Sequence, residues 1–178
     1  METQQFWQLI EDARQRAAEP ADAEAVAEAA RALLAERSPE QIVAAERALD
    51  TLLAQSYLNP LWAAAYTING GCSDDGFDYF RGWLIMQGRA VFEAALADPD
   101  SLAELPAVRA AAGEWEDLSC ETTLSIALAA HREVTGEELP LDPGGLRYPE
   151  LDPAWDFDFD DREEMARRLP RLAALYLD

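Results

Sequence analysis

Between Asp50 and Asp74 the chain carries no charge for 23 consecutive residues, although 28% of all its residues are charged. A stretch of this length in so charged a chain must be buried. Asn59-Pro60 and Asn69-Gly70-Gly71 interrupt it. Its longest unbroken apolar part, residues 61–68, is far shorter than the roughly 20 residues that a membrane-spanning helix needs. We therefore expect this stretch to form the centre of the core.

Signals that start and stop helices recur along the chain. Ser38, followed by Pro39 and by Gln41 three residues on, forms a capping box before a run with apolar residues at helical spacing. No long alternating run of β-branched residues predicts a strand. For 178 residues we predict an all-α fold, a single compact domain of about seven to nine helices.

Two segments have unusual compositions. Residues 21–37 are dominated by alanine and glutamate, which predicts a surface helix with few apolar anchors. Residues 139–154 hold four prolines and two adjacent glycines, which favours an ordered loop or arm. We expect residues 139–160 to extend the one domain, residues 1–178, rather than to form a second domain.

The chain has 35 acidic and 14 basic residues, all of the latter arginine, and a net charge of -21. This field repels phosphate groups, so we expect no nucleic-acid and no membrane partner. Acidity serves solubility in many proteins, and a basic protein partner is the sharper alternative. Two cysteines make no disulfide framework, and the N-terminus lacks the pattern of a secretory signal, so we expect a cytosolic protein. The sequence indicates no oligomeric state.

The run from Asn69 to Arg89 holds five of the nine glycines, three carboxylates, two arginines and four aromatic residues. Glycine inside a helix costs roughly 1 kcal/mol relative to alanine, so this segment needs a reason in backbone geometry or close approach. On a helical wheel Asp74, Asp78, Arg81 and Arg89 fall within a sector of about 80°. Most other positions are apolar, so we expect a central helix with a partly buried polar stripe.

Two interpretations of this stripe are open. In the first, Asp78 and Arg81 form an ion pair that only organises the core. In the second, the stripe is the floor of a pocket, and the Gly70-Gly71 turn offers free amides to an anion, although Asp74 and Asp75 already neutralise that helix end. The candidate ligand-binding residues are Asn69, Asp74, Asp75, Asp78, Arg81, Trp83, Gln87 and Arg89.

Other motifs carry weaker chemistry. Cys72 or Ser73 with the only histidine, His131, would suit a hydrolase, but Ser73 is better placed as a helix cap. The run from Asp156 to Asp161 has the first spacings of a calcium loop but lacks the required glycine and glutamate, so we expect its aromatic residues to face the core and its acids to face water. No zinc cluster or nucleotide-binding loop is present, and we predict no cofactor and no resident metal.

Several motifs resemble a known family. They are Phe6-Trp7 with Ile10, Leu61-Trp62-Ala63-Ala64-Ala65-Tyr66, the run from Asn69 through Asp74-Asp75-Gly76-Phe77 to Ile85, and Asp98-Pro99-Asp100-Ser101-Leu102. Together, over roughly residues 5–136, they are similar to the bacterial domain of unknown function 4240. The resemblance implies no established activity, substrate or catalytic residue.

Two functional hypotheses follow. The first is a non-enzymatic interaction or regulatory module that presents an acidic surface to a protein partner, with an antitoxin-like or immunity role as a special case. The second is a small enzyme or ligand-binding domain that uses Asp74, Asp75, Asp78, Arg81 and Arg89, with or without a divalent metal. Paired and sealed side chains would favour the first hypothesis, and a concave cleft with unpaired carboxylates would favour the second.

Overall fold

The computed structural model describes residues 1–114, 116–140 and 146–177, and within them the chain forms ten α-helices, three 3-10 helices and no strand. The α-helices are α1 (Thr3–Arg16), α2 (Ala23–Ala35), α3 (Pro39–Gln55), α4 (Asn59–Asn69), α5 (Asp74–Met86), α6 (Arg89–Ala97), α7 (Pro106–Glu114), α8 (Ile126–Thr135), α9 (Arg162–Arg168) and α10 (Pro170–Tyr176). The 3-10 helices are η1 (Pro99–Glu104), η2 (Thr122–Ser125) and η3 (Pro153–Trp155). The predicted all-α fold class is confirmed.

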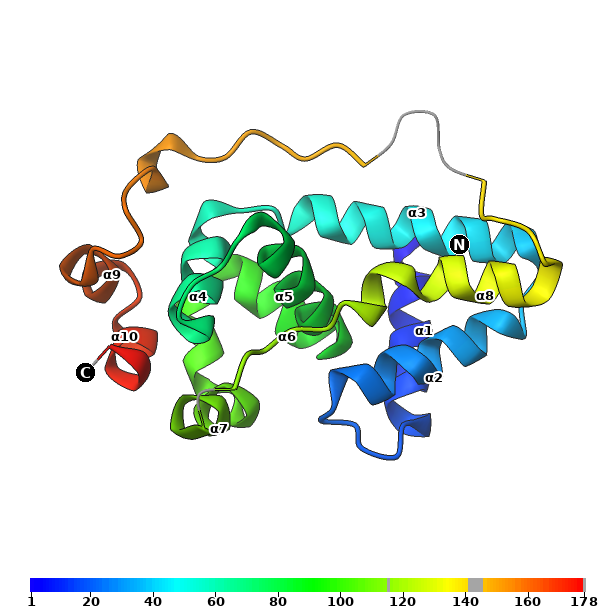
Figure 1. Ribbon diagram of the computed structural model, residues 1–178, viewed down its shortest axis with the longest axis horizontal. Helices are drawn as coiled ribbons and strands as arrows, with labels where there is room; N and C mark the ends of the chain where they lie inside the picture. Colours follow the sequence, from blue (N-terminus) through cyan, green and yellow to red (C-terminus); the bar gives the residue numbers. More distant parts are fainter. Residues whose placement is uncertain (115, 141–145, 178) are drawn as a thin grey trace.

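Helices α1, α2, α3 and α8 pack together at one end of the molecule, with α2 in contact with both α1 and α8 (Figure 1). The expected anchors of α2, among them Val26 and Leu34, are buried. Its alanines do more than predicted, because Ala23, Ala27 and Ala30 are buried as well. Small side chains let neighbouring helices approach closely, so α2 is an internal packing element on this face and exposed only on the other.

The uncharged stretch lies at the centre, as predicted. It covers the end of α3 and all of α4, where Leu61 and Ala64 are buried without exposed area. Helix α5 is buried on most sides, and a Cβ atom at Gly82 would lie 2.4 Å from the carbonyl oxygen of Cys120. Glycine at this position therefore lets the segment before η2 cross directly over α5. Among the described residues no helix is long and apolar enough to span a membrane.

Helix α5 ends earlier than the helical wheel assumed. Gly88 has φ +93°, and a Cβ atom there would lie 2.7 Å from Oε1 of Glu11. Only glycine adopts this conformation readily, so the chain breaks at this point and α6 begins at Arg89. Arg14 of α1 donates to the carbonyl oxygen of Met86 at 2.7 Å and satisfies the end of α5. The expected single helix through Arg89 is therefore wrong.

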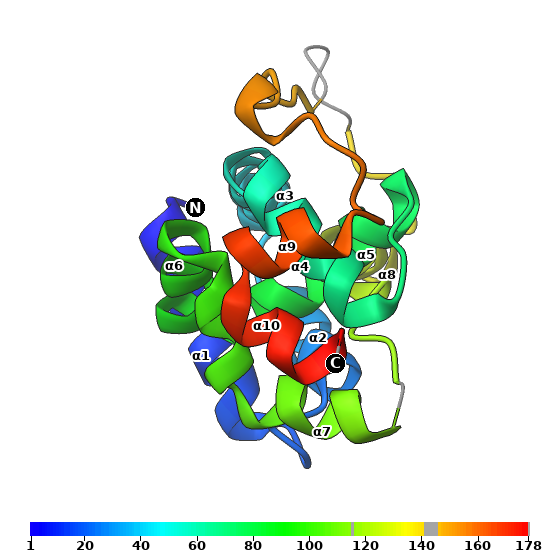
Figure 2. The same cartoon turned by 90° about the vertical axis from the view of Figure 1, so that its left-hand side faces the viewer.

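The C-terminal segment packs against the opposite end of the molecule from α8 (Figure 1), where α9 and α10 lie side by side (Figure 2). Buried Asp100 in η1 accepts hydrogen bonds from the backbone N–H groups of Arg171 and Leu172 and so caps α10. In the run before α9, Phe157 and Phe159 are half-buried while Asp156, Asp158 and Asp160 are exposed. This alternation confirms the predicted division between aromatic and acidic residues.

The predicted arm is extended where the structure describes it. Residues 146–152 lie outside helices and run from near the C-terminal end of α3, past the connection between α3 and α4, toward η3 (Figure 1). Asn59 at the start of α4 holds the far end, because its Nδ2 donates to the carbonyl oxygen of Asp152 at 3.0 Å. Residues 141–145, which belong to the same predicted arm, lie outside the described residues.

Candidate functional site

Arg81 in the middle of α5 is completely buried. Its Nε donates to the carbonyl oxygen of Phe77 at 3.3 Å, and its Nη1 donates to the carbonyl oxygen of Leu53 at the end of α3. Its Nη2 donates to the carboxylate of Asp78 and, at 3.1 Å, to the hydroxyl of Tyr148. Every nitrogen of the guanidinium is therefore bonded, which is what a buried cation requires.

Aromatic rings enclose the same guanidinium. Its central carbon lies 4.7 Å from the ring centre of Phe77, 4.8 Å from that of Tyr148 and 5.2 Å from that of Tyr57. The rings of Tyr57 and Tyr148 stack, with centres 4.2 Å apart and planes 17° apart. Trp62 stacks behind Phe77 with ring centres 4.7 Å apart. The aromatic faces thus add cation–π attraction to the hydrogen bonds of Arg81.

Among the residues that the structure describes, Asp78 supplies the carboxylate that pairs with Arg81. Its side chain is 34% exposed, and it also accepts a hydrogen bond from the Tyr148 hydroxyl at 3.4 Å. Burial raises the pKa of Tyr148, and the neighbouring Arg81 lowers it in part. The predicted pairing of Asp78 with a buried Arg81 is confirmed. We name Arg81, Asp78, Tyr57 and Phe77 the Arg81 cluster.

The other predicted charged residues do not join this cluster. Asp74 and Asp75 are exposed in the first turn of α5, where they complement the helix dipole. Ser73 caps that helix, as predicted, because its hydroxyl accepts from the N–H of Gly76 at 3.1 Å. Arg89 is exposed at the start of α6 and pairs with Glu93 at 2.7 Å. The break at Gly88 removes it from the α5 stripe.

The three polar or aromatic candidates without charge have structural partners. Trp83 is 3% exposed in the core, and its carbonyl oxygen accepts from Nε2 of Gln87 at 3.4 Å. Asn69 forms two hydrogen bonds with the backbone of Leu118, in the segment that follows α7. Its Nδ2 donates to the carbonyl oxygen of Leu118 at 3.2 Å, and its Oδ1 accepts from the N–H of Leu118 at 3.0 Å. Asn69 also lies on the wall of a cavity.

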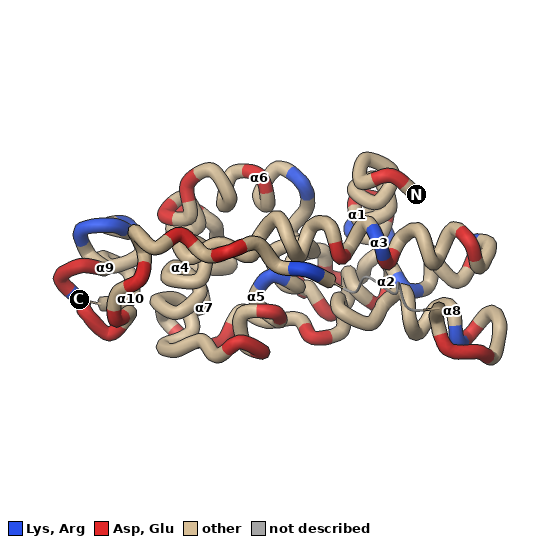
Figure 3. Tube along the Cα trace, turned by 90° about the horizontal axis from the view of Figure 1, so that it is seen from above, with Lys and Arg blue, Asp and Glu red and all other residues tan. Residues whose placement is uncertain are grey.

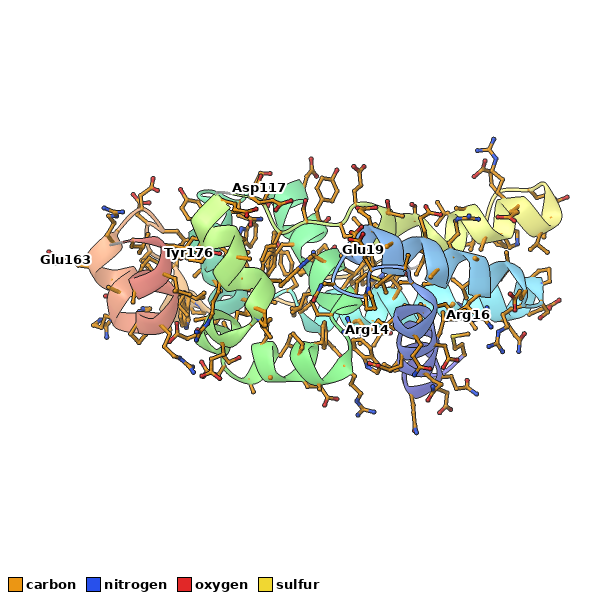
Figure 4. All side chains as sticks on the ribbon, turned by 90° about the horizontal axis from the view of Figure 1, so that it is seen from below. Arg14, Arg16, Glu19, Asp117, Glu163 and Tyr176 are labelled. Carbon is orange, nitrogen blue, oxygen red and sulfur yellow. The ribbon has the colours of Figure 1, made fainter. Side chains whose placement is uncertain are left out.

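The cavity has a volume of about 300 Å³ and lies between the end of α4, α10 and the run before α9. Its polar lining includes Asp117, Arg162 and Tyr66, whose hydroxyl donates to Asp160 at 2.7 Å. Figure 4 shows Tyr176 on α10 and Asp117 on the loop that follows α7, both of which line the cavity. Apart from Asn69, sequence reasoning missed this cavity, because its walls come from four segments that are distant in sequence.

Acidic side chains gather at the N-terminal end of α5. The group consists of Asp74, Asp75, Asp117 and Glu121, and we name it the α5 acidic face. Glu121, with added repulsion from Asp75, raises the pKa of Tyr79. Burial raises the pKa of Cys72 to about 12, with Asp117 and Asp74 among the contributing charges. Asp74, Asp75 and Asp117 make no ion pair within the described part of the chain.

The hydrolase arrangement considered above is absent. His131 is buried on α8, where its Nδ1 lies 3.2 Å from the carbonyl oxygen of Glu137 and 3.3 Å from the hydroxyl of Thr135. Cys72 lies between α4 and α5, and with a pKa of about 12 its thiol stays protonated at neutral pH. No three His, Cys, Asp or Glu side chains of the described residues are placed to hold a metal ion.

Comparison with known proteins adds one finding to this geometry. Neither a curated protein nor a solved structure matches the chain. The model of one family, described as a protein of unknown function (DUF4240), matches residues 1–133. This range includes α1 to η2 and most of α8, and it ends before the segment that carries Tyr148. The chain therefore belongs to the DUF4240 family.

Proposed function

We propose that the protein is a cytosolic, non-enzymatic interaction module that presents the α5 acidic face to a basic protein partner. The observation that carries the proposal is the set of exposed carboxylates around the start of α5 that pair with no cation among the described residues. A partner that brings arginine or lysine to this face supplies the missing charge.

The charge of the whole molecule supports the same partner class. Acidic positions are spread along the trace and basic positions are few (Figure 3), which agrees with the net charge of -21. Such a field attracts a basic protein from a distance and speeds its association. The field acts before contact, and the α5 acidic face would then decide where the partner docks.

The Arg81 cluster argues against an enzyme built on the α5 stripe. Arg81 donates hydrogen bonds to Asp78, to Tyr148 and to two backbone carbonyl groups. A catalytic arginine needs donors that face the reacting groups of a substrate, and while Tyr148 is in place every guanidinium nitrogen of Arg81 is bonded within the chain. The paired and covered state of Arg81 is the arrangement that favours the interaction module.

Titration with an arginine-rich peptide tests the proposal. The triple variant Asp74→Asn/Asp75→Asn/Asp117→Asn removes three charges from the face, and the matched control Glu19→Gln/Glu40→Gln/Glu137→Gln removes three exposed charges elsewhere. We expect the face variant to bind about tenfold more weakly than the control at physiological salt. Equal affinities would mean that the peptide responds only to net charge and would overturn the assignment to this face.

A ligand-binding domain is the second candidate function, and the cavity beside Asn69 is the observation that favours it. Its 300 Å³ lies at the lower end of small-molecule pockets, and Asp117 and Arg162 give it groups of opposite charge. A fragment screen followed by backbone NMR tests this candidate. A ligand in the cavity must shift the amide signals of both Gly70 and Leu177, and a screen without such a ligand removes it.

A further inference from the structure

The Arg81 cluster contacts both the ring and the hydroxyl of Tyr148, as a binding site contacts its ligand. Its ring stacks on Tyr57, and its hydroxyl both accepts from Nη2 of Arg81 at 3.1 Å and donates to Oδ1 of Asp78 at 3.4 Å. The cluster therefore reads the two features that define a phenol, a flat aromatic face and a hydroxyl that donates and accepts. A side chain 67 positions from Arg81 in sequence satisfies all of these contacts.

The segment that carries Tyr148 is held only lightly. Residues 146–150 are all exposed, and residues 146–151 make no backbone–backbone hydrogen bond with other described residues. The Tyr148 contacts and the Asn59–Asp152 hydrogen bond attach this segment to the helices, and Arg147 adds a further interaction. A segment with exposed backbone and few buried contacts opens at low free energy. We name residues 146–152 the strap.

The receptor and its occupant come from different parts of the chain. Tyr57, Phe77, Asp78 and Arg81 lie within residues 1–133, which the family model matches, and Tyr148 lies beyond that range. The family domain thus contains the aromatic faces, the guanidinium and the carboxylate of the site. The segment that covers them follows the matched region.

We propose that the Arg81 cluster is a phenol-binding site that the chain's own Tyr148 occupies, and that the strap lifts when another phenol replaces it. Asp78 beside Arg81 disfavours carboxylate and phosphate ligands, because it already neutralises the guanidinium and would repel a second anion. A neutral hydroxyl satisfies both groups. The phenol is either the tyrosine side chain of a partner protein or a free small molecule, and this site is independent of the α5 acidic face proposed above.

Binding of p-cresol to the Tyr148→Ala variant tests the chemistry of the site. The indole N–H of Trp62, which donates to the carbonyl oxygen of Cys72 at 3.0 Å, gives an NMR signal next to the cluster and is assigned with Trp62→Phe. We expect p-cresol to bind saturably and about tenfold more tightly than toluene, which cannot satisfy Arg81 and Asp78. Equal binding of the two, or no shift of the Trp62 signal, overturns the proposal.

N-acetyl-tyrosinamide separates the two sources of the phenol. If both N-acetyl-tyrosinamide and p-cresol bind saturably to Tyr148→Ala, the natural phenol is a tyrosine side chain. If only p-cresol binds to this variant, the natural phenol is a free small molecule. Leu146→Ala, at an exposed strap position, is the matched control. It must bind p-cresol as weakly as the unchanged protein, about tenfold or more below Tyr148→Ala, because its Tyr148 still competes from a tethered position. A control that binds as tightly as Tyr148→Ala overturns the proposal.

Limited trypsin digestion of the unchanged protein tests whether the strap lifts. The Arg147–Tyr148 bond lies within the strap, and cleavage there is identified by mass spectrometry. We expect p-cresol to speed this cleavage several-fold, since it traps the lifted strap, while toluene leaves the rate unchanged. Tyr148→Ala must be cleaved faster from the outset and must not respond to p-cresol. A cleavage rate in the unchanged protein that is the same with and without p-cresol overturns the lifting of the strap.

Discussion

Two arginines, Arg81 and Arg171, each tie together segments that are far apart in sequence, but they do so in opposite ways. Arg171 on α10 pairs with three carboxylates, those of Asp98, Asp100 and Glu104, and its side chain is 42% exposed. Arg81 pairs with the single carboxylate of Asp78 and is 0% exposed. Counting ion pairs would rank Arg171 as the stronger tie, and burial ranks Arg81 first.

The environment of a charge therefore matters more for stability than the number of its partners. Water solvates Arg171 and two of its three acids, so breaking one pair there exposes nothing new. The partners of Arg81 lie in or beside the core, so removing the guanidinium takes one hydrogen-bond donor away from a carboxylate and from each of two carbonyl oxygens. The four predictions that follow test this ranking, from the largest expected effect to the smallest.

Arg81→Ala is expected to lower the free energy of unfolding by about 3 kcal/mol, because it removes the cation that pairs with the half-buried Asp78 carboxylate and one donor from each of two carbonyl oxygens. The loss should couple to Asp78, so a double-mutant cycle with Asp78→Ala should give an interaction energy above about 0.5 kcal/mol. Chemical denaturation of the two single variants and the double variant measures both quantities. Additive losses below about 0.5 kcal/mol each would reverse the ranking of the two networks.

Asp100→Ala should cost about 2 kcal/mol, because buried Asp100 caps α10 through the N–H groups of Arg171 and Leu172. Asp98→Ala is the matched control, since exposed Asp98 pairs with the same arginine but bonds no backbone group. We expect it to cost less than about 0.5 kcal/mol. Denaturation curves for the two variants that coincide would show that exposure does not control these pairs.

Glu46 on α3 differs from the paired acids above, because its Oε2 atom is buried and has no hydrogen-bond partner among the described residues. Burial, with repulsion from Asp50, raises its pKa from an ordinary 4.5 to about 7. Between these two pH values the folded protein therefore holds a proton that the unfolded chain releases. The stability that Glu46 contributes through this proton is fully present below pH 4.5 and is lost as pH rises through 7. Relative to Glu46→Gln, the unchanged protein should lose about 1–2 kcal/mol between pH 5 and pH 8. A constant difference in thermal or urea melts would contradict this.

Tyr148→Phe should cost about 1 kcal/mol, the smallest effect of the four, because it keeps the stacking on Tyr57 and removes only the hydroxyl. Leu146→Phe at another exposed strap position is the control and should be neutral within about 0.5 kcal/mol. The measurement is again the free energy of unfolding in urea. If Tyr148→Phe is also neutral, the hydroxyl adds nothing to the Arg81 cluster.

Much of the fold could be predicted because its signals are local. The capping box at Ser38 specifies the first turn of α3, which follows it directly. The uncharged stretch before Asp74 specifies the burial of its own residues. The Asp78–Arg81 pair is also local, at a spacing of three residues in one helix. Each of these predictions needs only the helical repeat.

The parts that were missed depend on contacts between distant segments. Nothing near Tyr148 in sequence specifies that its ring meets Tyr57, and the cavity beside Asn69 is formed by four separate segments. The misplacement of Arg89 has a different cause, because a signal was present. Gly88 is a common helix stop, but the apolar residues after it continue the helical spacing and hide the break.

The bond from Arg81 to the carbonyl oxygen of Leu53 has a consequence for the order of folding. Leu53 lies in the last turn of α3, where Ser56 gives its oxygen one local donor at 3.2 Å and Arg81 gives it a remote one. The end of α3 is therefore completed only after α5 has docked. If docking follows the rate-limiting step, loss of Arg81 will speed unfolding and leave the refolding rate nearly unchanged, and stopped-flow kinetics would place this contact late on the pathway.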